Sequence, residues 1–454
     1  MADQLLRAGA AASNITPPLG VSINGGMSDR TATHVHDELH ARSLVLDDGQ
    51  TRLAITVCDS CMLPRSVLDR AKHLAHGHTG IPLAHMLISA THTHSAPAAA
   101  PVFQSDPDPA YLEFLATRIA DGIRRADHNL APAQIGWGVG REPNQVFNRR
   151  WKMRDAVTLV DPFGRADHVR MNPPRASADL LEPAGPIDPE VSVLSVRTTD
   201  GRPLALLANY SLHYVGGVPG GDISADYYGA FADRVQQLLV ADRLDPPFVG
   251  IMSNGTSGNI NNINFRVAGE SQPPFAQIKV VADALAREAA RVAGEIEYRD
   301  RASLAMREAS LRLARRATPK DEVARAKFIL SQAQNMQLQG VEQIYARETV
   351  LLNEYPPYVE TLVQALRIGE LGIATSPCET FVETGLAIKE ASPLQPTFTI
   401  ELANDYCGYL PTAEQHALGG YETWRARSSF LEVTAEQKIR QTALELLKQV
   451  ASAR

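Results

Sequence analysis

Short apolar stretches typical of strands alternate with amphipathic stretches typical of helices along most of the chain, and this alternation limits its possible folds more than any other feature. Residues 44–46 and 53–57 predict a hairpin, because they flank a glycine-containing turn at 47–50. Residues 64–76 carry apolar side chains at helical spacing. Further strands are predicted at 86–88, 191–196, 204–208, 248–252, 363–368, 372–375 and 398–402, and further helices at 109–129, 227–240, 275–296, from 381 and to about 451. The pattern predicts an α/β fold in which helices flank a large mixed β-sheet core.

Two local features refine this prediction. Residues 317–348 are rich in Ala, Gln, Glu and Arg at helical spacing, which predicts a helical insertion that serves as scaffold, oligomer contact or lid. Thr434 and Gln437, three residues apart, predict a capping box at the start of the last helix. No internal repeat or low-complexity linker divides the chain, so we expect residues 1–454 to form a single domain.

Composition excludes several classes of protein. With 44% hydrophobic and 21% charged residues the chain is globular, and no apolar run approaches the roughly 20 residues that cross a bilayer. Its 44 basic and 51 acidic residues give a net charge of −7, which argues against a nucleic-acid partner. The start of the chain lacks the pattern of a secretory signal, and four cysteines in a chain of this length predict free thiols in a reducing cytoplasm. Cys58 and Cys61 form one Cys-x-x-Cys pair, where a zinc ribbon needs two.

Polar clusters follow five of the predicted strands. His92 and His94 come directly after 86–88, and if strand geometry persists both imidazoles leave the same face, one to bind a metal and one to face a substrate. The alternative is a polar strand end whose histidines are bound by backbone carbonyls. His213 follows 204–208 and enters a glycine-rich loop, as either a ligand or an ordinary loop residue.

The other three clusters are weaker alone. The loop after 248–252 contains Asn254, Gly255 and Ser257, and its glycines and asparagines suit either an anion-binding nest or a plain turn. Glu379 follows 372–375, as a ligand or as a carboxylate at a helix start. Tyr406 and Tyr409 follow 398–402. Together the clusters supply the three His and carboxylate ligands that a catalytic zinc needs.

The ordered series of motifs resembles the catalytic domain of the neutral/alkaline (non-lysosomal) ceramidase family. The most specific piece is Thr91-His92-Thr93-His94-Ser95-Ala96-Pro97. The other pieces are Asn14-Ile15-Thr16-Pro17-Pro18-Leu19-Gly20, Ala41-Arg42, Asn148-Arg149, Asp188-Pro189-Glu190-Val191, Ile223-Ser224-Ala225-Asp226, Gly255-Thr256-Ser257-Gly258-Asn259, Glu379 and the segment 404–409. Their order and spacing extend over nearly the whole chain.

The resemblance implies roles for individual residues. In that family two histidines, a glutamate and a tyrosine hold zinc. The implied zinc ligands here are His92, His213, Glu379 and Tyr406, with Tyr409 as the alternative tyrosine. The implied catalytic residues are His94 beside the substrate carbonyl, Arg149 in substrate binding and Ser257 at the position of the family's serine. We expect Asn254, Gly255 and Tyr409 to line the substrate site.

The resemblance implies a zinc-dependent hydrolase that cleaves an N-acyl amide bond with zinc-activated water, on a small-molecule or lipid-like substrate that need not be ceramide. The loop around Ser257 is one residue shorter than the family's and lacks its Asp and Pro, so attack by Ser257 and attack by water both stay open. We expect no C-terminal β-sandwich domain. The alternatives are a zinc hydrolase of an ester, lactone or glycosidic bond in a small soluble molecule, a catalytically silent binding protein, and a metal-free serine hydrolase.

Overall fold

Eight strands form the largest sheet of the computed structural model, which describes residues 5–154 and 157–453. Their order is β14-β12-β11-β6-β1-β3-β4-β5. The bounds are β1 (Arg7–Asn14), β3 (His40–Asp47), β4 (Arg52–Cys58), β5 (Met86–Ala90), β6 (Ala131–Arg141), β11 (Glu190–Thr198), β12 (Pro203–Tyr210) and β14 (Val249–Asn254). Because β4–β5 and β12–β14 are parallel and the other pairs antiparallel, the prediction of a large mixed sheet is confirmed.

This sheet is strongly bent. Strands β1 and β6 pair only where Arg7 meets Pro132 and Ala8 meets Ala131. Strand β14 at one end of the sheet contacts β3, β4 and β5 of the other half. Leu46 on β3 and Leu207 on β12 therefore belong to one buried cluster, which also takes in side chains of a second sheet.

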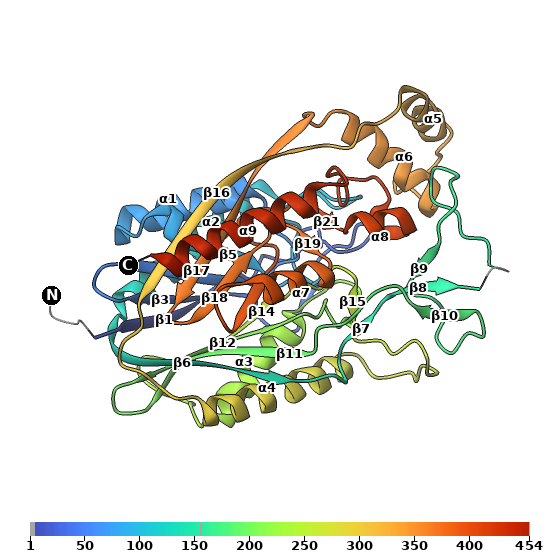
Figure 1. Cartoon of the computed structure of the whole chain (residues 1–454). Coiled ribbons are helices and arrows are strands. Elements are labelled where there is room, and N and C mark those ends of the chain that lie inside the picture. Colours follow the sequence, from blue (N-terminus) through green and yellow to red (C-terminus); the bar gives the residue numbers. More distant parts are fainter. Residues whose placement is uncertain (1–4, 155–156, 454) are drawn as a thin grey trace.

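Two pairs of helices cover the outer faces of the bent sheet, on opposite sides of the molecule (Figure 1). Helices α1 (Arg65–Thr79) and α2 (Pro109–His128) pack on the β1–β3–β4 half, and α3 (Asp226–Leu238) and α4 (Ala276–Glu295) pack on the half with β6, β11 and β14. Helix α2 begins at residue 109 as predicted, where Pro109 suits the first turn, and Asp108 caps it by accepting the N–H of Ala110.

A second sheet has the order β16-β17-β18-β20 and supports α7 and α9. Its bounds are β16 (Leu304–Ala314), β17 (Tyr358–Ile368), β18 (Leu371–Thr375) and β20 (Thr397–Ile400), with α7 (Val382–Ala391) and α9 (Ala435–Ser452). Helix α9 begins where predicted, but the capping box is wrong. Thr434 has φ −85° and ψ 1° rather than an extended backbone, and its hydroxyl donates to Glu432 instead of capping the helix.

The predicted helical insertion is confirmed. Helices α5 (Lys320–Ser331) and α6 (Gly340–Asn353) pack against each other and interrupt the hairpin between β16 and β17 (Figure 1). Among the described residues no helix has the length and apolar character needed to span a membrane.

Several two-residue strands pair loops with one another. Strand β7 (Phe147–Asn148) pairs with β15 (Ile260–Asn261), and β19 (Glu379–Thr380) pairs with β21 (Tyr409–Leu410). The remaining elements are β2 (His34–Val35), β8 (Arg150–Met153), β9 (Val169–Met171), β10 (Leu180–Pro183), β13 (Asp222–Ile223), α8 (Ala413–Leu418) and two 3₁₀ turns, Leu83–His85 and Tyr421–Thr423. These pairings bring together loops that are far apart in the sequence.

Lys72 on α1 is buried, and burial lowers its pKa to about 8 although Glu308 opposes the shift. Between pH 8 and the unfolded value near 10.5 the unfolded chain binds more protons, so the free energy of unfolding should rise with pH in this window. We expect Lys72→Met to stabilise the protein at pH 7 by about 1–3 kcal/mol. Urea unfolding of both proteins at pH 7 and 10 checks this, and an equal gain at both pH values would contradict it.

Candidate metal centre

Three side chains from distant parts of the chain converge on one point. His92 Nε2 lies 3.1 Å from His213 Nε2 and 3.2 Å from the Oε2 of Glu379, and His213 Nε2 lies 3.8 Å from the same oxygen. All three residues are buried. Donor atoms that share a tetrahedral zinc at 2.0–2.1 Å are about 3.4 Å apart. The spacing of the three atoms therefore suits a common ion.

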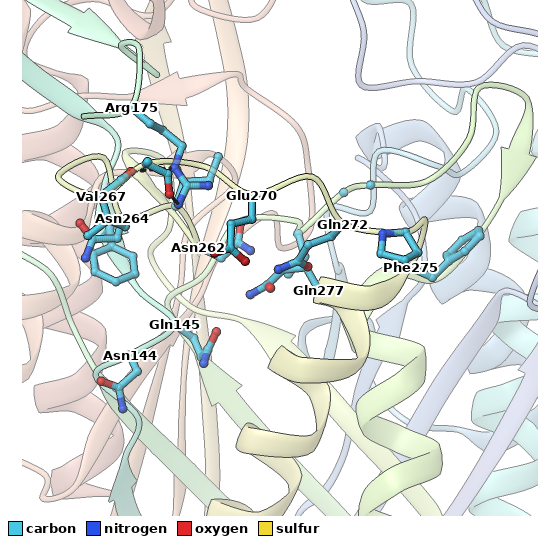
Figure 2. Close-up of a pocket in the computed structure, with 17 residues that line it drawn as sticks. Asn144, Gln145, Arg175, Asn262, Asn264, Val267, Glu270, Gln272, Phe275 and Gln277 are labelled. Carbon is cyan, nitrogen blue, oxygen red and sulfur yellow. Dashed lines mark hydrogen bonds between the residues drawn. The ribbon is translucent and has the colours of Figure 1, made fainter. Parts of the chain in front are cut away.

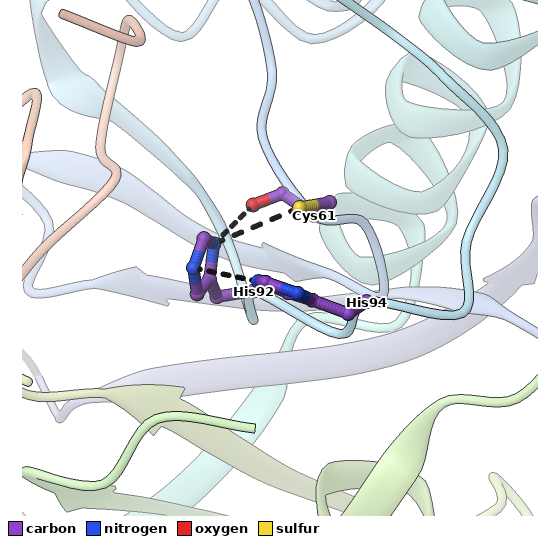
Figure 3. Close-up of side chains that lie close together, drawn as sticks. All are labelled: Cys61, His92 and His94. Carbon is purple, nitrogen blue, oxygen red and sulfur yellow. Dashed lines mark hydrogen bonds between the residues drawn. The ribbon is translucent and has the colours of Figure 1, made fainter. Parts of the chain in front are cut away.

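His92 reaches this point in a way that the sequence did not indicate. Strand β5 ends at Ala90, and His92 has φ +78°, in the left-handed region that few non-glycine residues adopt. The expectation that strand geometry persists through His94 is therefore wrong. The loop still brings the Nε2 of His94 to 3.1 Å from the Nε2 of His92, and Figure 3 shows the two rings edge to face beside Cys61.

The same nitrogen of each histidine is left free for a metal. His92 Nδ1 lies 2.7 Å from the carbonyl oxygen of Cys61, and His213 Nδ1 lies 3.2 Å from the carbonyl oxygen of Ser257. Each Nδ1–H donates to that carbonyl, so the lone pair is on Nε2, which faces Glu379. A second cluster joins the Cys61 thiol to His92 and His94, but the His92 nitrogen that contacts the thiol, Nδ1 at 3.9 Å, already donates to the Cys61 carbonyl. The His92–His213–Glu379 cluster is therefore the better candidate.

His213 is fixed by the start of α3. It lies three residues beyond β12, and the hydroxyls of Tyr227 and Tyr228 both donate to the carbonyl of the preceding Leu212. Two residues further on, the backbone N–H of Val215 donates to the Asp226 carboxylate. Hydrogen bonds thus hold the backbone on both sides of His213, at Leu212 and at Val215.

Glu379 has one oxygen with a hydrogen bond and one without. The Tyr406 hydroxyl donates to Oε1 at 2.9 Å, whereas the buried Oε2 forms no well-aligned hydrogen bond. A buried carboxylate oxygen without a partner is costly. Oε2 points to the two histidine Nε2 atoms, so a cation at that point would satisfy all three groups. This donor set of two imidazoles and a carboxylate is typical of catalytic zinc sites.

Charge around the cluster favours a cation. Burial lowers the pKa of His92, but the Glu379 carboxylate outweighs burial and holds that pKa well above its ordinary value. Burial raises the pKa of Glu379, but His92 outweighs it and the pKa is lowered. Burial lowers the pKa of both His94 and His213 well below the ordinary value, helped by His92 at His94 and by Arg149 at His213. His94 and His213 are therefore neutral, whereas without an ion His92 holds a proton against Glu379, and a cation at that point would take the place of this proton.

Tyr406 and Tyr409 both lie close to Glu379, as the two tyrosine alternatives require. Tyr406 donates its hydrogen bond to Oε1 directly. Tyr409 pairs with Glu379 across β19–β21 and accepts a hydrogen bond of 3.1 Å from Arg149. A hydrogen bond from Tyr409 also helps to lower the pKa of Glu379, so both hydroxyls lie against the carboxylate.

Arg149 is buried, and its guanidinium is largely committed to the protein. It donates to Glu422 at 2.9 Å, to the Gly258 carbonyl at 2.8 Å and to Tyr409. Arg150 donates to the other oxygen of Glu422 at 2.7 Å. Glu422 thus forms ion pairs with two buried arginines. The sequence analysis did not single out Glu422.

Ser257 lies behind His213 rather than beside an open cavity. Its side chain is fully buried, and its hydroxyl donates to Glu401 at 2.6 Å. His213 Nδ1 is 3.4 Å from the same hydroxyl. Glu401 also accepts the N–H of Thr380 at 2.6 Å, and burial raises its pKa to about 8. Glu401 was also not predicted, because it lies inside the apolar strand pattern 398–402.

Asn254 and Gly255, which were predicted to line the substrate site, face the interior of the protein. The Gly255 N–H donates to the Tyr210 carbonyl, which leaves it no donor for a ligand. The Asn254 side chain is buried, and neither of its polar atoms has a hydrogen bond partner. Gly258 supports the centre differently, since a side chain there would come within 2.5 Å of the Glu379 carbonyl oxygen.

His94 is held by neighbours that the sequence analysis missed. Its ring stacks on Tyr214 at 3.6 Å, and Arg30 donates to its carbonyl at 2.7 Å. Gly25, with φ +97°, passes so close to the ring that a Cβ would lie 2.4 Å from it. The proximity of Tyr214 to His213 in the sequence is the one local signal that could have indicated this packing.

Comparison with known proteins identifies the fold. The chain matches the crystal structure of neutral ceramidase from Pseudomonas aeruginosa with a TM-score of 0.74 and 20% sequence identity, over 99% of this chain and 74% of that one. A structure described as ceramidase complexed with C2 matches with a TM-score of 0.73 and 18% identity, over 99% of this chain and 75% of that one. No protein-family model matches the sequence, and no curated protein matches it either. The likeness of fold agrees with the resemblance in the motifs.

Proposed function

We propose that this chain, which has the fold of neutral ceramidase, is a zinc-dependent hydrolase that cleaves an N-acyl amide bond. The observation that carries the proposal is the convergence of His92, His213 and Glu379, three residues that the motifs had already singled out. A fold shared at 20% identity supports the architecture of the site, and the donor atoms themselves support the chemistry.

The metal ligands are His92 and His213 through Nε2 and Glu379 through Oε2, with Tyr406 beside Glu379 as the fourth protein group. Zinc bound there would supply Lewis acidity, which activates water and polarises a carbonyl. The carbonyls of Cys61 and Ser257 hold the two imidazoles in the tautomer that leaves Nε2 free.

His94 is the residue that moves a proton. Burial keeps it neutral, its Nε2 is 3.1 Å from His92 Nε2, and its Nδ1 is buried with no well-formed hydrogen bond. A neutral imidazole next to the reacting carbonyl can take a proton from water and give it to the leaving amine. Arg149 adds positive charge near the developing oxyanion and orients Tyr409.

Ser257 acts as a positioning residue in this proposal, because its hydroxyl already donates to Glu401 and lies on the Nδ1 side of His213. Ser257→Ala keeps the carbonyl that holds His213 Nδ1, so we expect it to weaken zinc affinity by at most about 10-fold and to leave substantial kcat at saturating zinc. Loss of a serine nucleophile would instead lower kcat by about 10⁶-fold at any zinc concentration. Measuring kcat against zinc concentration separates the two, and an unrescued collapse of kcat would establish Ser257 as the nucleophile.

The proposed activity is tested by measuring zinc content and hydrolysis on the same purified samples. We expect about one zinc per chain, hydrolysis of N-acyl amides, loss of activity on chelation and recovery on adding zinc. Matched esters of the same acyl groups form the second arm. Full activity after verified zinc removal would indicate a metal-free hydrolase. Turnover of the esters but not of the amides would show that the scissile bond is an ester.

A further inference from the structure

A large open cavity is walled by segments of the chain that also carry residues of the candidate metal centre. Its volume is about 770 Å³. Three segments that carry the proposed site residues continue into its wall, since Phe147 precedes Arg149, Val215 follows His213, and Asn262 follows the Ser257 loop. The cavity is therefore placed to hold the part of a substrate that extends away from the scissile bond.

Carboxamides dominate the polar lining of this cavity, and Figure 2 shows them arranged around the same space. They are Asn144, Gln145, Asn262, Asn264, Gln272 and Gln277. In the part of the chain that the structure describes, only the side chain of Asn264 among these six forms a hydrogen bond, to the N–H of Arg266. Gln145, Asn262 and Gln277 are half-buried. Five carboxamides are thus free to bind a ligand.

The charged groups of the lining leave little net charge. Arg175 uses its guanidinium to hold the loop above the cavity, because it donates to the carbonyls of Val267 and Ala268 at 3.1 Å and 3.0 Å. Glu270 is exposed at the rim. The interior therefore offers neutral groups that both donate and accept hydrogen bonds.

We propose that this cavity binds a neutral sugar, so that the substrate is an N-acylated amino sugar with the sugar as its amine half; this inference rests on the proposed amide hydrolysis. Hydroxyl groups donate and accept, which matches carboxamides one for one. An alkyl chain in the same place would desolvate five carboxamides without replacing their hydrogen bonds to water. Phe147, and the face of Phe275 that is not stacked on His36, add apolar ring surface for the C–H face of a sugar.

Two acetamides with the same acyl group test the inference. N-acetylglucosamine trimer and N-acetylsphingosine share the scissile bond and differ in the amine half. We expect a kcat/KM at least tenfold higher for the trimer. A third substrate, an N-acetylated alanine tripeptide amide, covers the possibility of a peptide, and a higher kcat/KM for either competitor would overturn the sugar assignment.

Variants of the lining give a readout that does not depend on turnover. We expect Gln145→Ala, Asn262→Ala and Gln277→Ala each to weaken calorimetric binding of the trimer by about 3- to 10-fold. Gln449→Ala, an exposed glutamine on α9 far from the cavity in sequence, is the matched control and should bind normally. Unchanged binding in all three lining variants would overturn the inference.

The two proposals fail separately in this design. Binding is measured on zinc-free Glu379→Gln protein, which lacks the proposed carboxylate ligand but retains every lining residue. Trimer binding that depends on the lining residues supports the sugar assignment even if no sample hydrolyses an amide. If the rate of amide hydrolysis is the same in the lining variants as in the unmodified protein, the result supports the metal site and overturns the sugar assignment.

Discussion

Glu379→Gln should leave the protein folded but without bound zinc, and hydrolysis should fall by at least about 10³-fold. The substitution keeps the size of the side chain and the Tyr406 hydrogen bond acceptor, but it removes the negative charge that faces two imidazoles. Residues that merely support a ligand cost about 10–100-fold in metal affinity, so a ligand itself should cost more. Zinc per chain after dialysis and kcat/KM on an N-acyl amide are the measurements.

The matched control for this experiment is Glu445→Gln, an exposed glutamate on α9. It should retain the zinc content and the activity of the unmodified protein. His92→Ala and His213→Ala should lose zinc as Glu379→Gln does. Unchanged zinc in all three variants would remove the proposed ligand set, whatever the activity.

Glu422→Gln should destabilise the fold by about 3–5 kcal/mol, more than any surface substitution. Glu422 is fully buried and shares its two oxygens between Arg149 and Arg150, at 2.9 Å and 2.7 Å. Neutralising it leaves two buried guanidinium groups without a counter-charge. Arg150 keeps its bonds to the carbonyls of Gln415 and Gly419, but these carry no full charge. Urea unfolding at pH 7 measures the loss.

The exposed ion pair between Arg325 and Glu342 supplies the control for the Glu422 prediction. Glu342→Gln should change the free energy of unfolding by less than about 1 kcal/mol, because solvent screens this pair. A loss below about 1 kcal/mol in Glu422→Gln would mean that the two arginines are satisfied without it. The buried triad would then be irrelevant to stability.

Periodic elements were the predictable part of the fold. Helix α2 and the β3–β4 hairpin follow from an apolar stripe and a turn sequence that act locally. Strand β16 was not predicted, since seven of its eleven residues are exposed or half-buried and include arginine and glutamate. The bend of the large sheet was also not predicted, because it depends on where β14 packs rather than on any local pattern.

Some residues of the candidate site were also predictable from the sequence, and others were not. His92, His213 and Glu379 were singled out because each follows an apolar strand, and the structure brings them together. Glu401 and Glu422 were missed, although each contacts a predicted residue, since their partners lie 144 and 273 positions away. A carboxylate inside an apolar strand carries no local sign of what it will bind.

The wide separation of the three donor residues has a consequence for biosynthesis. His92 and Glu379 are 287 positions apart, and the two-residue ladder that orients Glu379 needs Tyr409 as well. A nascent chain cannot assemble the proposed ligand set before residue 409 has left the ribosome. Products terminated before that residue should therefore be released without the proposed ion.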